Sequence, residues 1–334
     1  MEHWINHSYE PGLVSVVIPC HNQECFLPAC LQSLLAQDYR PLEIIVVDDG
    51  STDASAEVVK TFQKKQRNGL AVKYLYQSNQ GAPYARNCGC RQANGEFIQF
   101  LDGDDVLFKD KILPQVDLFK ELRDADVVYG DGQYLIDCLG FKAKKGRIIS
   151  IGYSSDMVAS LLFGAWVPSF SYLSRRSAVQ RCGPWDTSLQ VSQDFEYFLR
   201  MAIKGCRFHY LRGVTGLYRK HSDNTISEKS LSLNGWTKQG ILARAERMLS
   251  EKSELTENRI RAIAENYRRI ARQLYATDRE CFRNSIQNIL RLCPQYMPKS
   301  RKALLISSMI GFRNYEIFAA IISHLIYKTK KDWF

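Results

Sequence analysis

Three aspartates follow directly after an apolar stretch: Asp102, Asp104 and Asp105 come after Phe97–Leu101 in the segment FLDGDD. Carboxylates this close repel one another unless a cation or bound protons offset their charge. Carboxylate oxygens are the ligands that hard divalent cations such as Mg²⁺ and Mn²⁺ prefer, and such a cation stabilises negative charge as a Lewis acid. The spacing therefore predicts a divalent-cation site here, with a solvated acidic turn as the alternative.

The chain before and through this segment alternates between two kinds of pattern. Continuous apolar runs are typical of buried strands, and apolar residues at helical spacing are typical of amphipathic helices. This alternation predicts an α/β fold, with a mostly parallel, Rossmann-like sheet covered by helices on both faces. We expect strands at Leu13–Pro19, Leu42–Val47, Val72–Tyr76 and Phe97–Leu101, and helices at Cys25–Ala36, Asp53–Gln66 and Ala82–Ala93.

Polar clusters lie at the exits of three of these expected strands. PCHN (Pro19–Asn22) follows the first strand, DDGSTD (Asp48–Asp53) the second and DGDD (Asp102–Asp105) the fourth. Open sheets of this kind bind ligands beyond the carboxyl ends of their strands, so the three clusters should face one crevice. A residue of Ser51–Asp53 could cap the next helix, but capping does not explain two carboxylates in front of Gly50.

The pattern changes after residue 105. Val127–Tyr129 predicts a further strand, Lys142–Arg147 (KAKKGR) a solvated basic loop, and the chain from about Trp236 long helices. From residue 235 onward 19 Lys+Arg stand against 9 Asp+Glu, so the formal net charge of +10 belongs to this C-terminal region. The asymmetry indicates that the C-terminal region, rather than the body of the protein, meets something anionic.

Two apolar runs in the C-terminal region, Ala303–Ile310 and Ile317–Tyr327, are each too short to span a bilayer. Two interpretations fit them equally well. One is an amphipathic helix or hairpin lying on anionic lipid, and the other is a helical subdomain that packs on the body with a solvated basic face. Basic residues flank the two runs, at Lys299, Arg301, Lys302, Lys328, Lys330 and Lys331.

The two ends of the chain also bear on location. The stretch MEHWINHSYEP lacks a basic segment followed by an apolar one, so we expect no secretory signal and a cytoplasmic chain. The basic C-terminal region would then make it peripheral on the cytoplasmic face of a membrane. The ten cysteines contain no CxxC pair, which favours free buried thiols over disulfides or a zinc site.

Other classes of protein fit these patterns less well. Haloacid-dehalogenase phosphatases use Asp-x-Asp-Gly-Thr after a strand, but Asp105 stands where that motif needs glycine. No GxGxxG follows the first expected strand, and no Walker A lysine loop is present, which argues against dinucleotide oxidoreductases and P-loop enzymes. A nucleic-acid binder would account for the basic C-terminal region but not for carboxylates at the strand exits, so we expect no nucleic-acid partner.

Five blocks, in order and at fitting separations, together resemble family 2 glycosyltransferases of the GT-A fold. They read VSVVIPCHN, IIVVDDGSTD, GAPYARNCGCRQANGEFIQFLDGDD, VSQDFEYFLR and YRKHSDNTIS, and they span about residues 13–227. The resemblance implies a GT-A domain over residues 13–230, with a basic helical C-terminal region over 235–334.

The same resemblance implies an activity. It points to an inverting, hexosyltransferase-like enzyme of polysaccharide biosynthesis. The enzyme would move a sugar from a nucleotide-sugar, expected to be a UDP-sugar, to a hydroxyl of a saccharide or lipid-linked saccharide. The alternative within the fold is a catalytically inactive relative that binds a nucleotide or saccharide.

The resemblance also assigns the metal and nucleotide contacts. Asp104 and Asp105 match the metal motif, with Mn²⁺ or Mg²⁺ as the cation. Asp49 matches the residue that reads the edge of the base. Arg86 matches an arginine that faces nucleotide or phosphate, with an exposed helix charge as the alternative. The nucleotide contacts that it implies are Pro19, His21, Asn22, Asp49, Arg86, Asp102 and Asp104.

The closing loop YRKHS carries two further matches. Arg219 and His221 match residues that close over the diphosphate or the metal. An arginine offers a bidentate fork to phosphate, and a neutral imidazole can complete a metal shell. For both residues the alternative is a surface loop without a role in binding, and this alternative is stronger for His221 than for Arg219.

The reaction needs a general base, because an attacking hydroxyl must lose its proton to a group within hydrogen-bond reach. A carboxylate that ligates a metal cannot easily serve, since its lone pairs are committed. Asp194 matches the family's base, with Glu196 as the second candidate. Gln193 stands where the family usually has an acidic residue, which leaves the tuning of the base open. Asp194 could also cap the helix FEYFLRMAI.

Overall fold

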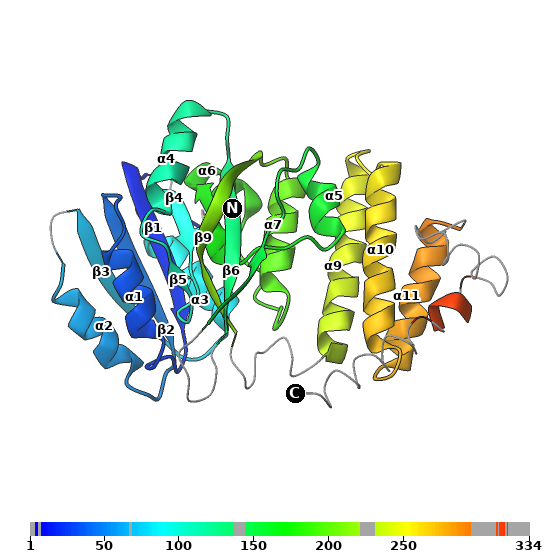
Figure 1. Ribbon diagram of the computed structural model, residues 1–334, viewed down its shortest axis with the longest axis horizontal. Coiled ribbons are helices and arrows are strands. Elements are labelled where there is room, and N and C mark those ends of the chain that lie inside the picture. The colour runs from blue at the N-terminus through cyan, green and yellow to red at the C-terminus, as the bar shows by residue number, and fades with distance from the viewer. Residues whose placement is uncertain are drawn as a thin grey trace. The chain divides into compact units, whose positions relative to one another are not determined.

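The computed structural model of the chain describes residues 4–5, 8–66, 69–136, 144–220, 231–294, 312, 314–317 and 319. The chain forms two compact units (Figure 1). The first comprises Met1–Met157 and Ala165–Asp223, and the second comprises Val158–Gly164 and Asn224–Phe334. The short segment Val158–Gly164 therefore belongs to the unit built mainly from the C-terminal part of the chain.

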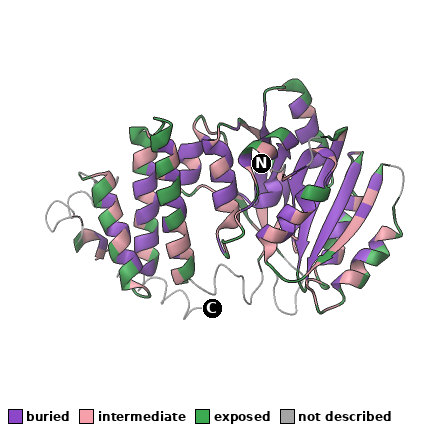
Figure 2. Cartoon of the chain, turned by 180° about the vertical axis from the view of Figure 1, so that it is seen from behind, coloured by how far each residue is buried: buried purple, intermediate pink, exposed green. Residues whose placement is uncertain are grey.

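The first unit contains the predicted parallel strands, in the spatial order β3–β2–β1–β4. Every residue of β2 is buried, as expected for an apolar strand covered on both faces, and Figure 2 shows mostly buried strands in this half of the sheet. The four predicted strands and three helices are confirmed, with ends within three residues of those expected. The elements are β1 (Glu10–Cys20), α1 (Leu27–Leu35), β2 (Leu42–Asp49), α2 (Ser55–Gln63), β3 (Leu70–Gln77), α3 (Ala82–Gln92) and β4 (Gly95–Phe100).

Beyond β4 the sheet is mixed. Its order continues β4–β8–β6–β9–β5, with β7 pairing on β6. Strand β8 runs antiparallel to both β4 and β6, so β6 runs in the same direction as β4. The predicted strand at Val127–Tyr129 is confirmed as the start of β6. These elements are β5 (Val106–Leu107), β6 (Val127–Ile136), β7 (Lys144–Ile149), β8 (Tyr172–Arg175) and β9 (Phe208–Lys220).

The basic segment Lys142–Arg147 was predicted to be a loop, and this prediction is wrong from Lys144 onward. Residues 144–149 form β7, which pairs antiparallel with β6. Lysines and arginines are compatible with pairing on a strand such as β7, where four of six side chains are exposed to water. Charge in this segment therefore indicated solvent exposure correctly but not the absence of a strand.

Helices and one 3₁₀ turn complete the first unit and position its loops. The ring of Trp185, which precedes α7, stacks on Tyr197 within that helix at a centroid distance of 4.0 Å. Asn87 of α3 ties this segment to the parallel sheet, since its side chain bonds both the amide and the carbonyl of Trp185, at 2.8 and 2.9 Å. The elements are α4 (Ile112–Glu121), η1 (Ser169–Ser171), α6 (Arg176–Cys182) and α7 (Gln193–Ile203).

The second unit is helical, which confirms the expected helical C-terminal region. Asp278 caps α11 by accepting a hydrogen bond from the amide of Cys281 at 2.8 Å. The amide of Asn266 donates to the carbonyl of Leu162 at 2.8 Å, which joins α10 to α5. The helices are α5 (Met157–Leu162), α9 (Leu231–Glu251), α10 (Glu257–Leu274) and α11 (Arg279–Leu292).

The two apolar runs near the C-terminus fall outside the described residues, apart from Ile317 and Ala319. Within the part of the chain that the structure does describe, no helix has the length and apolar character needed to cross a membrane. The nine cysteines in that part are all free thiols, as expected, but Cys25 is exposed and Cys88 and Cys293 are only partly buried, so the expectation of burial is wrong for these three.

Candidate active site

The exits of β1 and β2 lie side by side because the two strands are parallel neighbours. The His21 ring nitrogen Nδ1 lies 2.8 Å from the carbonyl oxygen of Asp49. The amide of Asn22 donates to Ser51 Oγ at 3.0 Å, and Asn22 Oδ1 accepts from the amide of Thr52 at 2.8 Å. PCHN and DDGSTD thus form one connected surface, with Pro19 buried at the end of β1.

The carboxylate of Asp49 is buried and largely occupied by protein donors. It accepts hydrogen bonds from Gln77 Nε2 at 2.7 Å and from the amides of Gln80 and Gly81 at 2.8 Å each. A carboxylate has about four acceptor positions, and these three hydrogen bonds leave one of them. Asp49 therefore holds the loop between β3 and α3. The sequence predicts that the same residue contacts the base of the nucleotide.

Arg86 lies on α3 and is 5% exposed, which contradicts the alternative of an exposed helix charge. Its Nη2 donates to Asp102 Oδ1 at 2.6 Å, and its Nη1 donates to Gln193 Oε1 at 3.0 Å. Its guanidinium also lies over the ring of Trp185 at 4.6 Å. Arg86 therefore joins the acidic exit of β4 to the start of α7.

The acidic segment after β4 contains an unsatisfied buried atom. Asp105 is 1% exposed, and its Oδ1 accepts from the amide of Arg219 at 2.9 Å. Its Oδ2 is buried and has no hydrogen-bond partner among the residues that the structure describes. Burial raises the pKa of Asp105 well above its usual value, and the charges of Asp104 and Asp102 raise it further. A divalent cation would satisfy the orphaned oxygen and offset these charges, so the chemistry of this segment fits such an ion.

Of the two residues predicted in the closing loop, the structure describes only Arg219. Arg219 Nε donates to the carbonyl of Asp104 at 2.9 Å, and its guanidinium lies over the ring of Phe26 at 5.2 Å. His221 lies outside the described residues. Within the described ranges, no three His, Cys, Asp or Glu side chains form a ready-made cation site. Arg219 thus holds the acidic segment from the end of β9.

Asp194 lies in the first turn of α7, one residue after the helix begins. The N-cap position is Ser192, so the alternative that Asp194 caps this helix is wrong, although an acid in the first turn still favours the helix dipole. Burial raises the pKa of Asp102 against the opposing charge of Arg86, and the charges of Asp104 and Asp194 add to the rise. Arg86 bonds both Asp102 and Gln193, the residue before Asp194, so Asp194 lies near the acidic segment.

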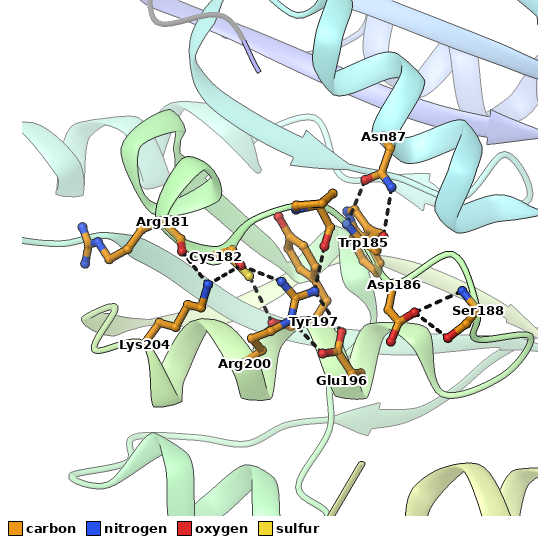
Figure 3. Close-up of polar contacts among 11 residues, drawn as sticks. Asn87, Arg181, Cys182, Trp185, Asp186, Ser188, Glu196, Tyr197, Arg200 and Lys204 are labelled. Atoms are coloured by element: carbon orange, nitrogen blue, oxygen red, sulfur yellow. Dashed lines mark hydrogen bonds and ion pairs between the residues drawn. The ribbon is translucent and has the colours of Figure 1, made fainter. Parts of the chain in front are cut away.

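Glu196, the second candidate base, is committed elsewhere. It is 3% exposed and accepts from Arg200 Nε at 2.7 Å and Nη2 at 3.0 Å, as Figure 3 shows. Arg200 Nη1 in turn donates to the carbonyl of Cys182 at 2.6 Å. This network ties α7 to α6, so Glu196 has a structural role.

Replacing Glu196 by Gln should therefore lower stability and spare catalysis. The loss of a charged partner for the half-buried Arg200 should cost about 1–3 kcal/mol in the free energy of unfolding, measured in denaturant. The kcat for sugar transfer should stay unchanged under conditions where the variant is folded. A loss of kcat at full folding would return Glu196 to the list of candidate bases.

One residue at this site was not predicted from the sequence. The indole Nε1 of Trp166 donates to Asp194 Oδ2 at 2.8 Å. Trp166 lies in the stretch Leu161–Leu173, which resembles ordinary core because it is apolar and interrupted by glycine and proline. An isolated tryptophan between small residues is the signal that was available, and it is a weak one.

Solved structures share this fold. The structure of residues 1–349 of TarS from S. aureus in complex with UDP-GlcNAc superposes with a TM-score of 0.67 at 19% identity, over 93% of this chain and 91% of that one. The mannosyltransferase PcManGT from Pyrobaculum calidifontis in complex with GDP-Man and Mn²⁺ has a TM-score of 0.56 at 16% identity, over 98% and 88% of the two chains. The fold is therefore that of the GT-A glycosyltransferases.

Sequence comparison gives the family. The model named Glycosyl transferase family 2 matches residues 15–182. An uncharacterised glycosyltransferase of Rickettsia prowazekii is 30% identical over 199 residues, which is 58% of this chain and 59% of the relative. The glycosyltransferase GlyG of Streptococcus pneumoniae is 40% identical over 120 residues, 36% of this chain and 38% of the relative.

The chain belongs to glycosyl transferase family 2. It spans about three fifths or less of the length of these curated relatives. The match ends at residue 182, so Asp194 and the closing loop lie beyond it.

Proposed function

We propose that this protein is a metal-dependent, inverting glycosyltransferase that moves a sugar from a nucleotide-sugar to a hydroxyl of a saccharide or lipid-linked saccharide. The observation that carries the proposal is the orphaned Oδ2 of Asp105, buried at the exit of β4 beside Asp102 and Asp104. A buried acceptor without a partner costs free energy, and a divalent cation on a diphosphate removes that cost. Family membership supports the same conclusion.

The nucleotide would lie across the exits of β1, β2 and β4. Asp104 and Asp105, with His221, would hold Mn²⁺ or Mg²⁺, and Arg219 would close over the diphosphate. The cation, when bound, would neutralise the negative charge of the departing diphosphate. Residues that would contact the nucleotide are Pro19, His21, Asn22, Asp49, Arg86, Asp102 and Asp104. Arg86 would also hold Asp102 in place, because its Nη2 bonds Asp102 and its Nη1 bonds Gln193.

Asp194 would act as the general base. In an inverting transfer the acceptor hydroxyl attacks the anomeric carbon on the face opposite the diphosphate. The new C–O bond forms as the bond to the diphosphate breaks, and the hydroxyl proton passes to the carboxylate. Asp194 suits this role because one of its oxygens bonds Trp166 and the other has no hydrogen-bond partner among the described residues.

The donor is proposed to be a UDP-sugar. Support comes from the TarS structure, which is a complex with UDP-GlcNAc, whereas the PcManGT structure is a complex with GDP-Man and Mn²⁺. The test is release of nucleotide from UDP-GlcNAc, UDP-glucose and GDP-mannose, each with Mn²⁺ and with simple glycoside acceptors. Turnover of one donor that stops with chelator supports the proposal. Tight nucleotide binding without turnover of any donor would favour a binding-only relative instead.

The basic C-terminal region, over residues 235–334, is proposed to lie on the cytoplasmic face of a membrane. The excess of Lys+Arg over Asp+Glu in this region supports the proposal, because such clusters bind anionic lipid by charge. The full chain should co-sediment with vesicles containing phosphatidylserine at low salt, and the binding should weaken at high salt. Failure to co-sediment at low salt would leave this region as a helical subdomain only.

A further inference from the structure

We propose that Trp166 is a positioning residue that orients the carboxylate of Asp194 toward the acceptor hydroxyl. This inference rests on the proposed function, because it concerns the base of that reaction. It also assigns different tasks to the two oxygens of Asp194. One oxygen is held by the protein, and the other receives the proton.

The direction of this hydrogen bond is fixed, with the indole as the donor. Trp166 Nε1 donates to Asp194 Oδ2 at 2.8 Å, within the range of a well-formed hydrogen bond. An indole N–H is a donor only, so it cannot take a proton from the carboxylate or compete with it as a base. A hydrogen bond to a carboxylate is stronger than one between neutral groups, so it holds the orientation of its acceptor well. Oδ1 is then the oxygen left for the substrate.

The indole is in turn held by its neighbours. Its ring meets that of Tyr218 edge to face, with centroids 5.2 Å apart and planes at 82°. Tyr218 meets Tyr134 in the same way at 5.8 Å and 69°. Edge-to-face pairs have a preferred geometry, so turning the indole away from Asp194 would break its packing on Tyr218.

Strand β9 connects this arrangement to the acidic segment. Tyr218 precedes Arg219, whose amide donates to Asp105 Oδ1 at 2.9 Å. One strand therefore supports both the ring that orients the base and the backbone donor that orients the metal carboxylate. The terminal torsion of an aspartate is broad and has little preference of its own. Without Trp166 the carboxylate of Asp194 would sample many orientations, and few would suit an in-line attack.

Replacement of Trp166 by Phe tests the inference, because it keeps a ring against Tyr218 and removes only the N–H donor. The kcat for transfer should fall by about 10–100-fold, since small errors in positioning cost this much, while the dissociation constant for the nucleotide stays unchanged. The matched control is Trp236→Phe. Trp236 Nε1 donates to Asp278 Oδ2 at 2.9 Å in the second unit, so the same chemical group is lost from the same kind of partner. Its kcat should equal that of the wild type.

A double variant separates positioning from general loss of structure. In the Asp194→Asn background, adding Trp166→Phe should leave the residual rate unchanged, because the base that Trp166 orients is already absent. A further fall in that background, or an unchanged kcat in Trp166→Phe alone, would overturn the inference and leave the proposed function standing.

A spectroscopic readout does not depend on activity. In an NMR spectrum of the indole N–H groups, the Trp166 signal is the one that disappears in Trp166→Phe. This signal should shift in Asp194→Asn and stay in place in Asp278→Asn. The Trp236 signal should shift in Asp278→Asn and stay in place in Asp194→Asn. An unmoved Trp166 signal in Asp194→Asn would overturn the inference at its first step. If the signal shifts as expected but the wild-type protein transfers no sugar from any donor, the proposed function fails, and the positioning role fails with it.

Discussion

Replacing Asp194 by Asn should lower kcat for sugar transfer by about 10²–10⁴-fold, the range by which a positioned general base accelerates proton transfer. The change keeps the shape of the side chain and an oxygen that can accept from Trp166, so the first turn of α7 should stay intact. The affinity for nucleotide and metal should remain that of the wild type, because Asp194 contacts neither in the proposed arrangement. Steady-state kinetics and nucleotide titration measure the two quantities separately.

Glu196→Gln is the natural control for this prediction, because it removes a carboxylate from the same helix two residues away. Only Asp194→Asn should affect turnover. If Asp194→Asn lost nucleotide binding, the carboxylate would belong to the donor site rather than to the acceptor side. If it kept full turnover, another group would be the base.

Replacing Asp105 by Ala should remove metal-dependent nucleotide affinity. Loss of residues that only support a metal ligand typically costs 10–100-fold in metal affinity, so loss of a direct ligand should cost at least about 100-fold. Calorimetric titration of the nucleotide with and without Mn²⁺ measures the effect. The weak, metal-independent part of the affinity should remain.

The control for this variant is Asp126→Ala. Asp126 is also buried, at 7% exposed, and pairs with Arg181 at 2.8 Å. Asp126 precedes β6, which runs in the same direction as β4. It therefore lies at the start of the strands, at the opposite end from the exit of β4. Asp126→Ala should lose stability and keep metal-dependent affinity. An equal loss in both variants would mean that Asp105 acts through folding rather than through the cation.

The parallel half of the sheet could be predicted because its signal is local. LVSVVIP and LEIIVV are short continuous apolar runs, which are typical of strands buried on both faces. In the mixed part of the sheet only the start of β6, Val127–Tyr129, carried such a signal. Strand β7 is short and basic, and its pairing with β6 depends on partners that the local pattern does not reveal.

The residue types of the candidate site could be predicted from the sequence, but most of its hydrogen-bond partners could not. The acidic segment after β4 was visible because three carboxylates in four residues are unusual. By contrast, the donors to Asp49 come from residues 77–81, about thirty positions further along, and no spacing rule reports them. The partner of Arg86 on α7 is more than a hundred residues away. Trp166 had no motif at all, so only the fold brings it to Asp194.

We propose that the carboxylates at the strand exits hold a cation, which in turn holds a nucleotide diphosphate. Calorimetric titration of the wild-type chain with UDP, GDP, dTDP and CDP, each with and without Mn²⁺, is the decisive measurement. One nucleotide, expected to be UDP, should bind in the presence of Mn²⁺ and far more weakly after chelation. Binding of the same strength with and without the metal, or no binding of any of the four, would show that the carboxylates do not hold a nucleotide through a cation.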